Sequence, residues 1–257
     1  MKSQLSIVQK RAISSKNLQN RLNINKKLGS KDLTKWLFKR YKIKKNDKIL
    51  ELGCGIGNHV LKHSEIVGKD GLILATDYSN VSLRVLKKNS KNKNIKIKCI
   101  PMDDIPAYLK IKKITFNKII SSYAIYYAKD PIKVIKGCSH FLTTNGKFLI
   151  TAPCYPHTLT EFALNEKTLP NSAKKYIDFS SNKLQAHLKP NKYIKKIYNF
   201  KNILKFKNIS HLLDFYRSTI FYNKKSEPSL INLFNKRKKN GYFNIIKSAK
   251  LFDFSLK

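Results

Sequence analysis

Cysteine, arginine and long apolar runs are all scarce in this sequence of 257 residues, and each shortage excludes a class of protein. The four cysteines stand far apart, at positions 54, 99, 138 and 154. They form no CxxC pair and their spacing fits no zinc template, so we expect no metal and a reducing compartment. No apolar run approaches the roughly 20 residues that span a bilayer, and residues 1–25 lack the apolar core of a signal peptide. We therefore expect a cytoplasmic protein with no membrane partner.

The charge balance is strongly basic. Lysine and arginine total 53 against 15 acidic residues, which gives a net charge of +38. Such a balance suggests nucleic acid or another anionic partner. Only six of the basic residues are arginines, however, and phosphate and base readout draws mainly on arginine. Because the lysines are spread along the chain, we favour a solvated surface and keep nucleic acid as the alternative partner.

Strand-like and helix-like segments alternate through the middle of the chain. The apolar runs that predict strands are 48–52, 72–76, 95–99, 118–122 and 147–152. The segments between them that predict helices are 58–67, 79–91 and 130–142, and Thr143–Gly146 predicts a turn. This alternation, over about 100 residues, predicts βαβ units with a parallel sheet.

The two ends of the chain are less regular. Residues 3–28 look partly helical, a helix capped by Ser30 is predicted to end near Tyr41, and we treat 1–45 as an N-terminal helical extension. The remaining residues, 46–257, form the predicted main domain. Few periodic signals occur in 155–180, so we expect an inserted cap segment at about 155–200. Further elements are predicted as helices near 182–188, 208–217 and 226–238 and as strands near 193–206 and 242–256.

The segment Ile49–Gly57, ILELGCGIG, joins a strand, a tight glycine turn and the start of a helix. Glycine permits positive φ and lets the backbone approach a ligand closely. A plain strand–helix connection is the alternative, but three details favour a cofactor site. Asn58 replaces the third glycine of a dinucleotide G-x-G-x-x-G motif, and Glu51 suits a cofactor amine better than a phosphate. Asp77 ends the second strand, where an acid can accept hydrogen bonds from ribose hydroxyls.

Together these motifs resemble the class I S-adenosylmethionine-dependent methyltransferases of the small-molecule type, over about residues 46–152. ILELGCGIG matches the first motif of that family. Leu74–Ser79, LATDYS, matches the second, in which the resemblance implies that Asp77 binds both ribose hydroxyls and Tyr78 packs on adenine. Ile97–Ile105, IKCIPMDDI, matches the third, which implies an adenine contact from Asp103 or Asp104.

Two further segments extend the resemblance. Phe116–Asp130 matches the strand beneath the methionine part of the cofactor, although Asn117 replaces the usual acid, and His140–Ala152 matches the segment before the antiparallel end of the sheet. The implied fold is α/β: a Rossmann-like, seven-stranded, mostly parallel sheet with helices on both faces and an antiparallel last strand. The cofactor-binding residues that we expect are Glu51, Gly53, Cys54, Gly55, Gly57, Asp77, Tyr78, Met102, Asp103, Asp104, Ser121 and Ser122.

Methyl transfer from a sulfonium is an in-line displacement in which the cofactor carries the activation, so the protein mainly supplies proximity and alignment. A base is needed only where the acceptor must lose a proton. The candidates are His59, Tyr123 and Tyr127, followed by Tyr126 and His157. Each also has a simpler interpretation, as a helix-surface histidine or as a tyrosine in core packing.

Two signatures of nucleobase methylation are missing. Pro153-Cys154 is similar to the Pro-Cys nucleophile of cytosine-5 methyltransferases, but it follows the fifth predicted strand rather than the fourth. Residues 121–124, SSYA, stand where amino-methylating enzymes carry Asn/Asp-Pro-Pro-Tyr/Phe. The predicted acceptor is therefore a small molecule. The alternatives are an RNA methyltransferase that uses the basic surface and a non-catalytic, cofactor-binding regulatory protein.

Overall fold

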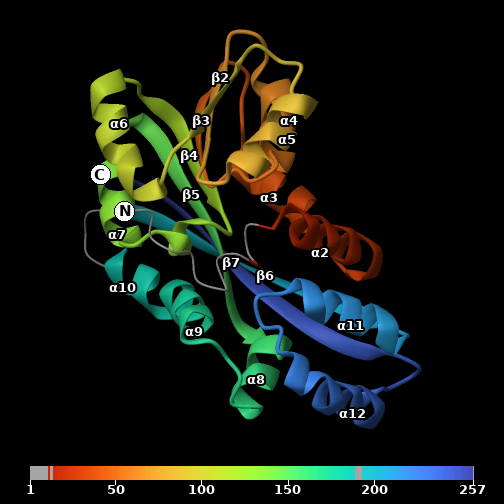
Figure 1. The fold of residues 1–257 in the computed structure, drawn as a ribbon. Helices are drawn as coiled ribbons and strands as arrows, with labels where there is room; N and C mark the ends of the chain where they lie inside the picture. Colours follow the sequence, from red (N-terminus) through yellow and green to blue (C-terminus); the bar gives the residue numbers. More distant parts are fainter. Residues whose placement is uncertain (1–10, 12–13, 189–192, 257) are drawn as a thin grey trace. The chain divides into compact units, whose positions relative to one another are not determined.

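A seven-stranded sheet organises the computed structural model, which describes residues 11, 14–188 and 193–256 (Figure 1). The strand order is β3-β2-β1-β4-β5-β7-β6, and the first five of these strands are parallel. The strands are β1 Lys48–Leu52, β2 Leu72–Asp77, β3 Ile95–Cys99, β4 Phe116–Ser122, β5 Leu142–His157, β6 Tyr193–Phe206 and β7 Phe243–Leu256. The last strands are antiparallel, so the predicted fold class is confirmed.

The strand order reverses beside β1, because β2 pairs with one edge of β1 and β4 with the other. Ligands of open α/β sheets bind at the carboxyl ends of the strands at such a switch point. The helices that follow the parallel strands are α4 Asn58–Val67, α5 Asn80–Asn89, α6 Ile105–Lys112 and α7 Pro131–Ser139. Figure 1 shows α4 and α5 on one side of these strands and α6 and α7 on the other.

The chain divides into two compact units. The parallel-sheet unit comprises 34–152, 179–199 and 250–257, and the second unit comprises 1–33, 153–178 and 200–249. This division differs from the predicted boundary near residue 45, because most of α3 (Leu33–Tyr41) falls in the parallel-sheet unit. Strands β5, β6 and β7 each pass from one unit into the other, so the predicted cap segment 155–200 is divided between them.

Each unit has its own apolar core. In the parallel-sheet unit, the central strands are buried on both faces, and Ile49, Leu50, Ile119 and Ile120 are completely inaccessible. Such uninterrupted apolar strands are typical of a parallel sheet. The core of the second unit is formed by α2 Ser15–Leu28, α8 Thr158–Asn165, α9 Asn171–Asp178, α11 Ile209–Ser218 and α12 Glu227–Arg237 together with strand residues.

Two predictions for individual segments are wrong. Thr143–Gly146 does not end the preceding helix in a turn, since β5 already begins at Leu142. The pairing of β5 with β4 shifts there, from Phe116↔Leu142 to Lys118↔Lys147, so the turn residues form a bulge within the strand. Residues 155–180 are more regular than expected and contain α8 and α9, which are short helices of eight residues each.

The remaining elements lie close to their predicted positions. The helix expected within 3–28 is α2, and residues 3–10 of that prediction lie outside the described residues. The helix expected at 182–188 is a π-helical turn, Phe179–Lys183, followed by α10 Leu184–His187. Within the described ranges, no helix is both long and apolar enough to cross a bilayer, and no three His, Cys, Asp or Glu side chains gather as metal ligands.

Candidate functional site

The glycine turn after β1 brings the loops of three strands together. Gly53, Gly55 and Gly57 all adopt positive φ, at 71°, 56° and 84°. A Cβ on Gly53 would lie only 2.3 Å from Ala124 Cβ and 3.2 Å from Met102 Cε. Met102 follows β3 and Ala124 follows β4, so the carboxyl ends of β1, β3 and β4 converge on this glycine. A side chain at Gly53 would force these loops apart.

Asp77, the last residue of β2, fixes the conformation of the glycine turn. Its two carboxylate oxygens accept hydrogen bonds from the backbone amides of Gly55, at 2.8 Å, and Ser79, at 2.7 Å. Burial raises the pKa of Asp77 above its usual range, although bonds from backbone amides act in the opposite direction. The structure thus brings Asp77 and the glycine turn together, as the motif spacing predicts.

The residues after β2 and β3 form a second wall of the same site. Tyr78 follows Asp77 and leaves 47% of its side chain exposed, which is unusual for a large aromatic residue. Met102, Asp103 and Asp104 form a short 3-10 turn, Met102–Asp104, ahead of α6. An exposed aromatic face and a polar turn at neighbouring strand ends can contact a flat, nitrogen-rich ring.

The two candidate acids of this turn have different surroundings. The Asp103 carboxylate accepts hydrogen bonds from the backbone amides of Lys129 and Asp130, both at 3.1 Å, and so ties down the chain before α7. Asp104 is exposed. Sequence reasoning could not separate the two residues, because the partners of Asp103 are supplied by a segment about 26 positions away.

The serines at the end of β4 contact the protein itself. Ser121 is completely buried, and its hydroxyl donates to the carbonyl of Leu52 at 3.3 Å. Ser122 hydrogen-bonds the hydroxyl of Tyr41, which also lies 3.4 Å from Thr151 Oγ1. Burial raises the pKa of Tyr41, so its hydroxyl stays protonated. These contacts join α3, β4 and β5 behind the glycine turn.

The tyrosines that follow β4 include a strained residue. Tyr123 has a φ of 56°, and a bulky residue in the left-handed region costs about 1–2 kcal/mol. Such strain is concentrated at functional sites. The rings of Tyr126 and Tyr127 lie 4.7 Å apart, with Tyr126 buried and Tyr127 half-buried. The predicted acceptor-side residues Tyr123 and Tyr127 therefore stand on the loop that also carries Ala124, beside Gly53.

Glu51 and the two histidines of α4 form a buried cluster next to the turn. Glu51 Oε1 lies 2.7 Å from Nδ1 of His63, and both side chains are buried. The ring of His59 packs edge-on against Phe38, with centroids 5.6 Å apart. Burial lowers the pKa of His59 to about 4, so its ring is neutral at pH 7. These aromatic contacts favour packing over base catalysis for His59.

The sequence did not single out His63, although one signal could have done so. His63 stands four residues after His59, on the same face of a predicted helix that starts at the glycine turn. The contribution of α3 to this cluster, through Phe38, had no comparable signal, because it depends on how α3 packs on α4.

Three other candidates have surroundings that limit their chemistry. Burial, together with the charges of Asp77 and Glu51, raises the pKa of Cys54 well above its usual value, so its thiol is protonated and weakly nucleophilic. Cys154 and His157 belong to the second unit. Cys154 is buried, and burial lowers the pKa of His157 to about 3, with its ring 5.2 Å from that of Phe221.

Comparison with known proteins identifies the family. Residues 43–208, well over half of the chain, match the family described as a methyltransferase domain. The chain is similar to a malonyl-[acyl-carrier protein] O-methyltransferase from Bacillus anthracis, with 29% identity over 154 residues that cover 58% of this chain and 55% of that protein. It is also similar to a ubiquinone/menaquinone biosynthesis C-methyltransferase from Wigglesworthia glossinidia brevipalpis, with 26% identity over 105 residues, or 41% of this chain and 42% of that protein.

The chain spans about half the length of these curated relatives. Among solved structures, a SAM-dependent methyltransferase from Aquifex aeolicus has the same fold, with a TM-score of 0.54, 11% identity and coverage of 93% of this chain and 97% of that one. The fold and the motif resemblance agree with the family match. This protein belongs to the family of methyltransferase domains.

Proposed function

We propose that this chain is a methyltransferase that uses S-adenosylmethionine and transfers the methyl group to a small molecule. The observation that carries the proposal is the convergence at Gly53, where the ends of three parallel strands meet beside a turn anchored by Asp77. This convergence lies at the switch point of the sheet, in a chain that belongs to a methyltransferase family.

The donor groups of this site fit the parts of that cofactor. Asp77 keeps a second lone pair on each carboxylate oxygen, and these can accept bonds from two ribose hydroxyls. Exposed Tyr78 offers a ring face to adenine, and Met102 offers an apolar contact. We assign the adenine amino group to Asp103 or Asp104, because Asp104 is exposed and each Asp103 oxygen keeps a second lone pair beside its bond from a backbone amide.

The methionine part belongs, in this proposal, beside the glycine turn. The carboxylate of Glu51 would pair with the ammonium group, and the positive-φ glycines of the turn would let the backbone approach the amino-acid chain closely. When bound, the cofactor supplies an electrophilic methyl group on a sulfonium. The acceptor would attack that carbon while the carbon–sulfur bond breaks, with the bonding pair kept by the sulfur.

Proximity and alignment are the protein's main contributions to this reaction. Tyr123, held in a strained conformation, and Tyr127 are the residues that we assign to the acceptor side. A tyrosine hydroxyl can hydrogen-bond an acceptor oxygen or nitrogen and orient it for attack. An acceptor that carries a proton on the attacking atom would lose that proton to solvent.

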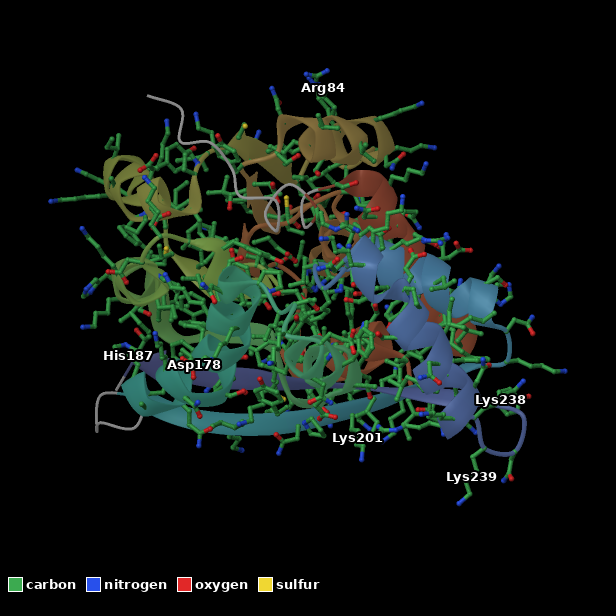
Figure 2. All side chains as sticks on the ribbon, turned by 60° about the horizontal axis from the view of Figure 1, so that its bottom comes forward. Arg84, Asp178, His187, Lys201, Lys238 and Lys239 are labelled. Carbon is green, nitrogen blue, oxygen red and sulfur yellow. The ribbon has the colours of Figure 1, made fainter. Side chains whose placement is uncertain are left out.

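Small molecules are the acceptors that we favour over RNA. The two relatives are named for O-methylation of malonyl-[acyl-carrier protein] and for C-methylation in ubiquinone and menaquinone biosynthesis, so an O- or C-methyl product is the first to seek. The labelled basic side chains of Arg84 on α5, of Lys201 on β6 and of the adjacent Lys238 and Lys239 after α12 point outward (Figure 2). Such scattered cations suit a solvated surface better than a single RNA-binding stripe. All four cysteines are free, which supports the proposed cytoplasmic location.

Methyl-labelled cofactor tests the function and the acceptor class together. The protein is incubated with the labelled cofactor in separate reactions, each of which contains the small-molecule, the protein or the RNA fraction of a cell extract. Label in a low-molecular-mass product supports the proposal, whereas label in RNA alone refutes the small-molecule acceptor. Cofactor binding without transfer in any fraction would support the regulatory alternative. The Asp77→Ala variant is the matched negative control.

A further inference from the structure

The buried pair of Glu51 and His63 lies directly beneath the glycine turn. Glu51 is the second-last residue of β1, and His63 stands on α4, which begins immediately after Gly57. Their side chains are 3% and 0% exposed, and His63 Nδ1 lies 2.7 Å from Glu51 Oε1. The two atoms are in close polar contact, although the ring N–H is not aligned for a linear hydrogen bond.

A buried carboxylate is stable only beside a partner, since removal from water costs several kcal/mol per ion. The groups that face this pair from neighbouring elements are Tyr41 on α3, Cys54 in the glycine turn and His59 on α4. Burial keeps Tyr41 and Cys54 protonated and His59 neutral at pH 7. His63 is the residue whose side chain makes the established close polar contact with the Glu51 carboxylate, at 2.7 Å.

Aromatic packing holds the ring of His63 in place. Phe38 of α3 stacks on it, with centroids 4.7 Å apart and planes inclined by 29°. Tyr41 meets the ring edge-on at 5.7 Å, and Tyr41 is itself bonded to Thr151 and Ser122. The position of Nδ1 is thus set by α3 and by the strand ends. A preorganised partner of this kind can hold one carboxylate oxygen without loss of side-chain entropy on binding.

We infer that His63 is a positioning residue for cofactor binding: it holds Oε1 of Glu51 so that the carboxylate is aimed at the ammonium group of the cofactor's amino-acid part. The inference rests on the proposed function. His63 does not touch the cofactor itself and acts only through Glu51. Its effect is therefore confined to ligands that carry the ammonium group.

Two ligands separate this role from a purely structural one. S-adenosylhomocysteine carries the amino-acid part, and 5′-methylthioadenosine lacks it but keeps the adenosine. Dissociation constants are measured by calorimetry for the wild type, Glu51→Gln, His63→Phe, His63→Asn and the double variant Glu51→Gln/His63→Phe. Phenylalanine keeps the ring that stacks on Phe38 without a donor, whereas asparagine keeps a donor near the position of Nδ1 without the ring.

The expected result is a loss of about tenfold or more in S-adenosylhomocysteine affinity for His63→Phe, because the buried Glu51 carboxylate loses its close polar neighbour. Its affinity for 5′-methylthioadenosine stays within about twofold of the wild type, and His63→Asn recovers part of the lost affinity. The double variant binds no more weakly than Glu51→Gln alone, because both changes remove one interaction.

Three outcomes would overturn the inference. Unchanged S-adenosylhomocysteine affinity in His63→Phe would show that His63 does not position Glu51 for cofactor binding. An equal loss of affinity for both ligands would show that its role is only structural. Additive losses in the double variant would separate His63 from Glu51. Failure of the wild type to bind either ligand is a distinct result, because it refutes the proposed function itself. If His63→Phe does not fold, His63→Asn and the Glu51→Gln comparison still decide the question.

Discussion

Alanine at Gly53 should destabilise the protein more than alanine at Gly241, although both glycines have positive φ, at 71° and 79°. A Cβ at Gly241 would meet nothing within 4 Å, so Gly241→Ala costs only the strain of the positive φ, about 1–2 kcal/mol. A Cβ at Gly53 would lie 2.3 Å from Ala124 Cβ, an atom that no rotation of a side chain can move away. Overpacking of this kind adds about 1–3 kcal/mol.

Urea unfolding of the two variants measures this difference, since both should keep the slope of the wild type. The expected gap between their free energies of unfolding is about 1–3 kcal/mol, with Gly53→Ala the less stable. Gly53→Ala should also lose about tenfold or more in S-adenosylhomocysteine affinity, whereas Gly241→Ala should bind within about twofold of the wild type. Equal unfolding free energies, or equal affinities, would refute the close approach of the strand ends at Gly53.

The remaining predictions concern charge and reactivity near the same turn. Asp77→Ala should weaken S-adenosylhomocysteine binding by about a hundredfold or more, as for the loss of two charged hydrogen bonds, whereas exposed Asp70→Ala at the other end of β2 should not. The folded-state pKa of His59 is about 4, below the usual value of about 6.5, so stability should fall by up to about 3 kcal/mol as the pH drops from 6.5 to 4. Replacement of His59 by Phe should flatten the pH dependence of the free energy of unfolding over this range. An unchanged pH dependence would contradict the prediction. Iodoacetamide at neutral pH should label exposed Cys99 well before Cys54, whose raised pKa keeps the thiol protonated, as peptide mass spectrometry can show.

The sequence was most informative where local chemistry determines structure. The three glycines of the turn adopt positive φ, and Asp77 ends a strand whose first four residues are apolar. The residue pattern alone was therefore enough to locate both features. Helix starts were equally clear at Ser79 and Asp130, whose side chains accept bonds from backbone amides in the first turn. These features depend on residues close together in the chain.

Features that depend on distant segments were missed. The turn residues Thr143–Gly146 became a bulge because β5 pairs with β4 on both sides of them. Helix α8 buries Leu159 and Phe162 against the core of the second unit, and so short a helix gains its stability from that packing rather than from its own sequence. The hydrogen bonds of Asp103 and the pairing of Glu51 with His63 likewise depend on how separate segments pack together, which the sequence alone does not give.

The choice between cofactors tests the central claim most directly. Wild-type protein is titrated calorimetrically with S-adenosylhomocysteine and, in a separate experiment, with NADH, because both cofactors bind glycine turns at the ends of parallel strands. We predict saturable binding of S-adenosylhomocysteine at one site, weakened by Asp77→Ala, and no binding of NADH. Saturable binding of NADH, or the absence of S-adenosylhomocysteine binding at millimolar concentration, would contradict the assignment of the glycine turn to a methyltransferase cofactor.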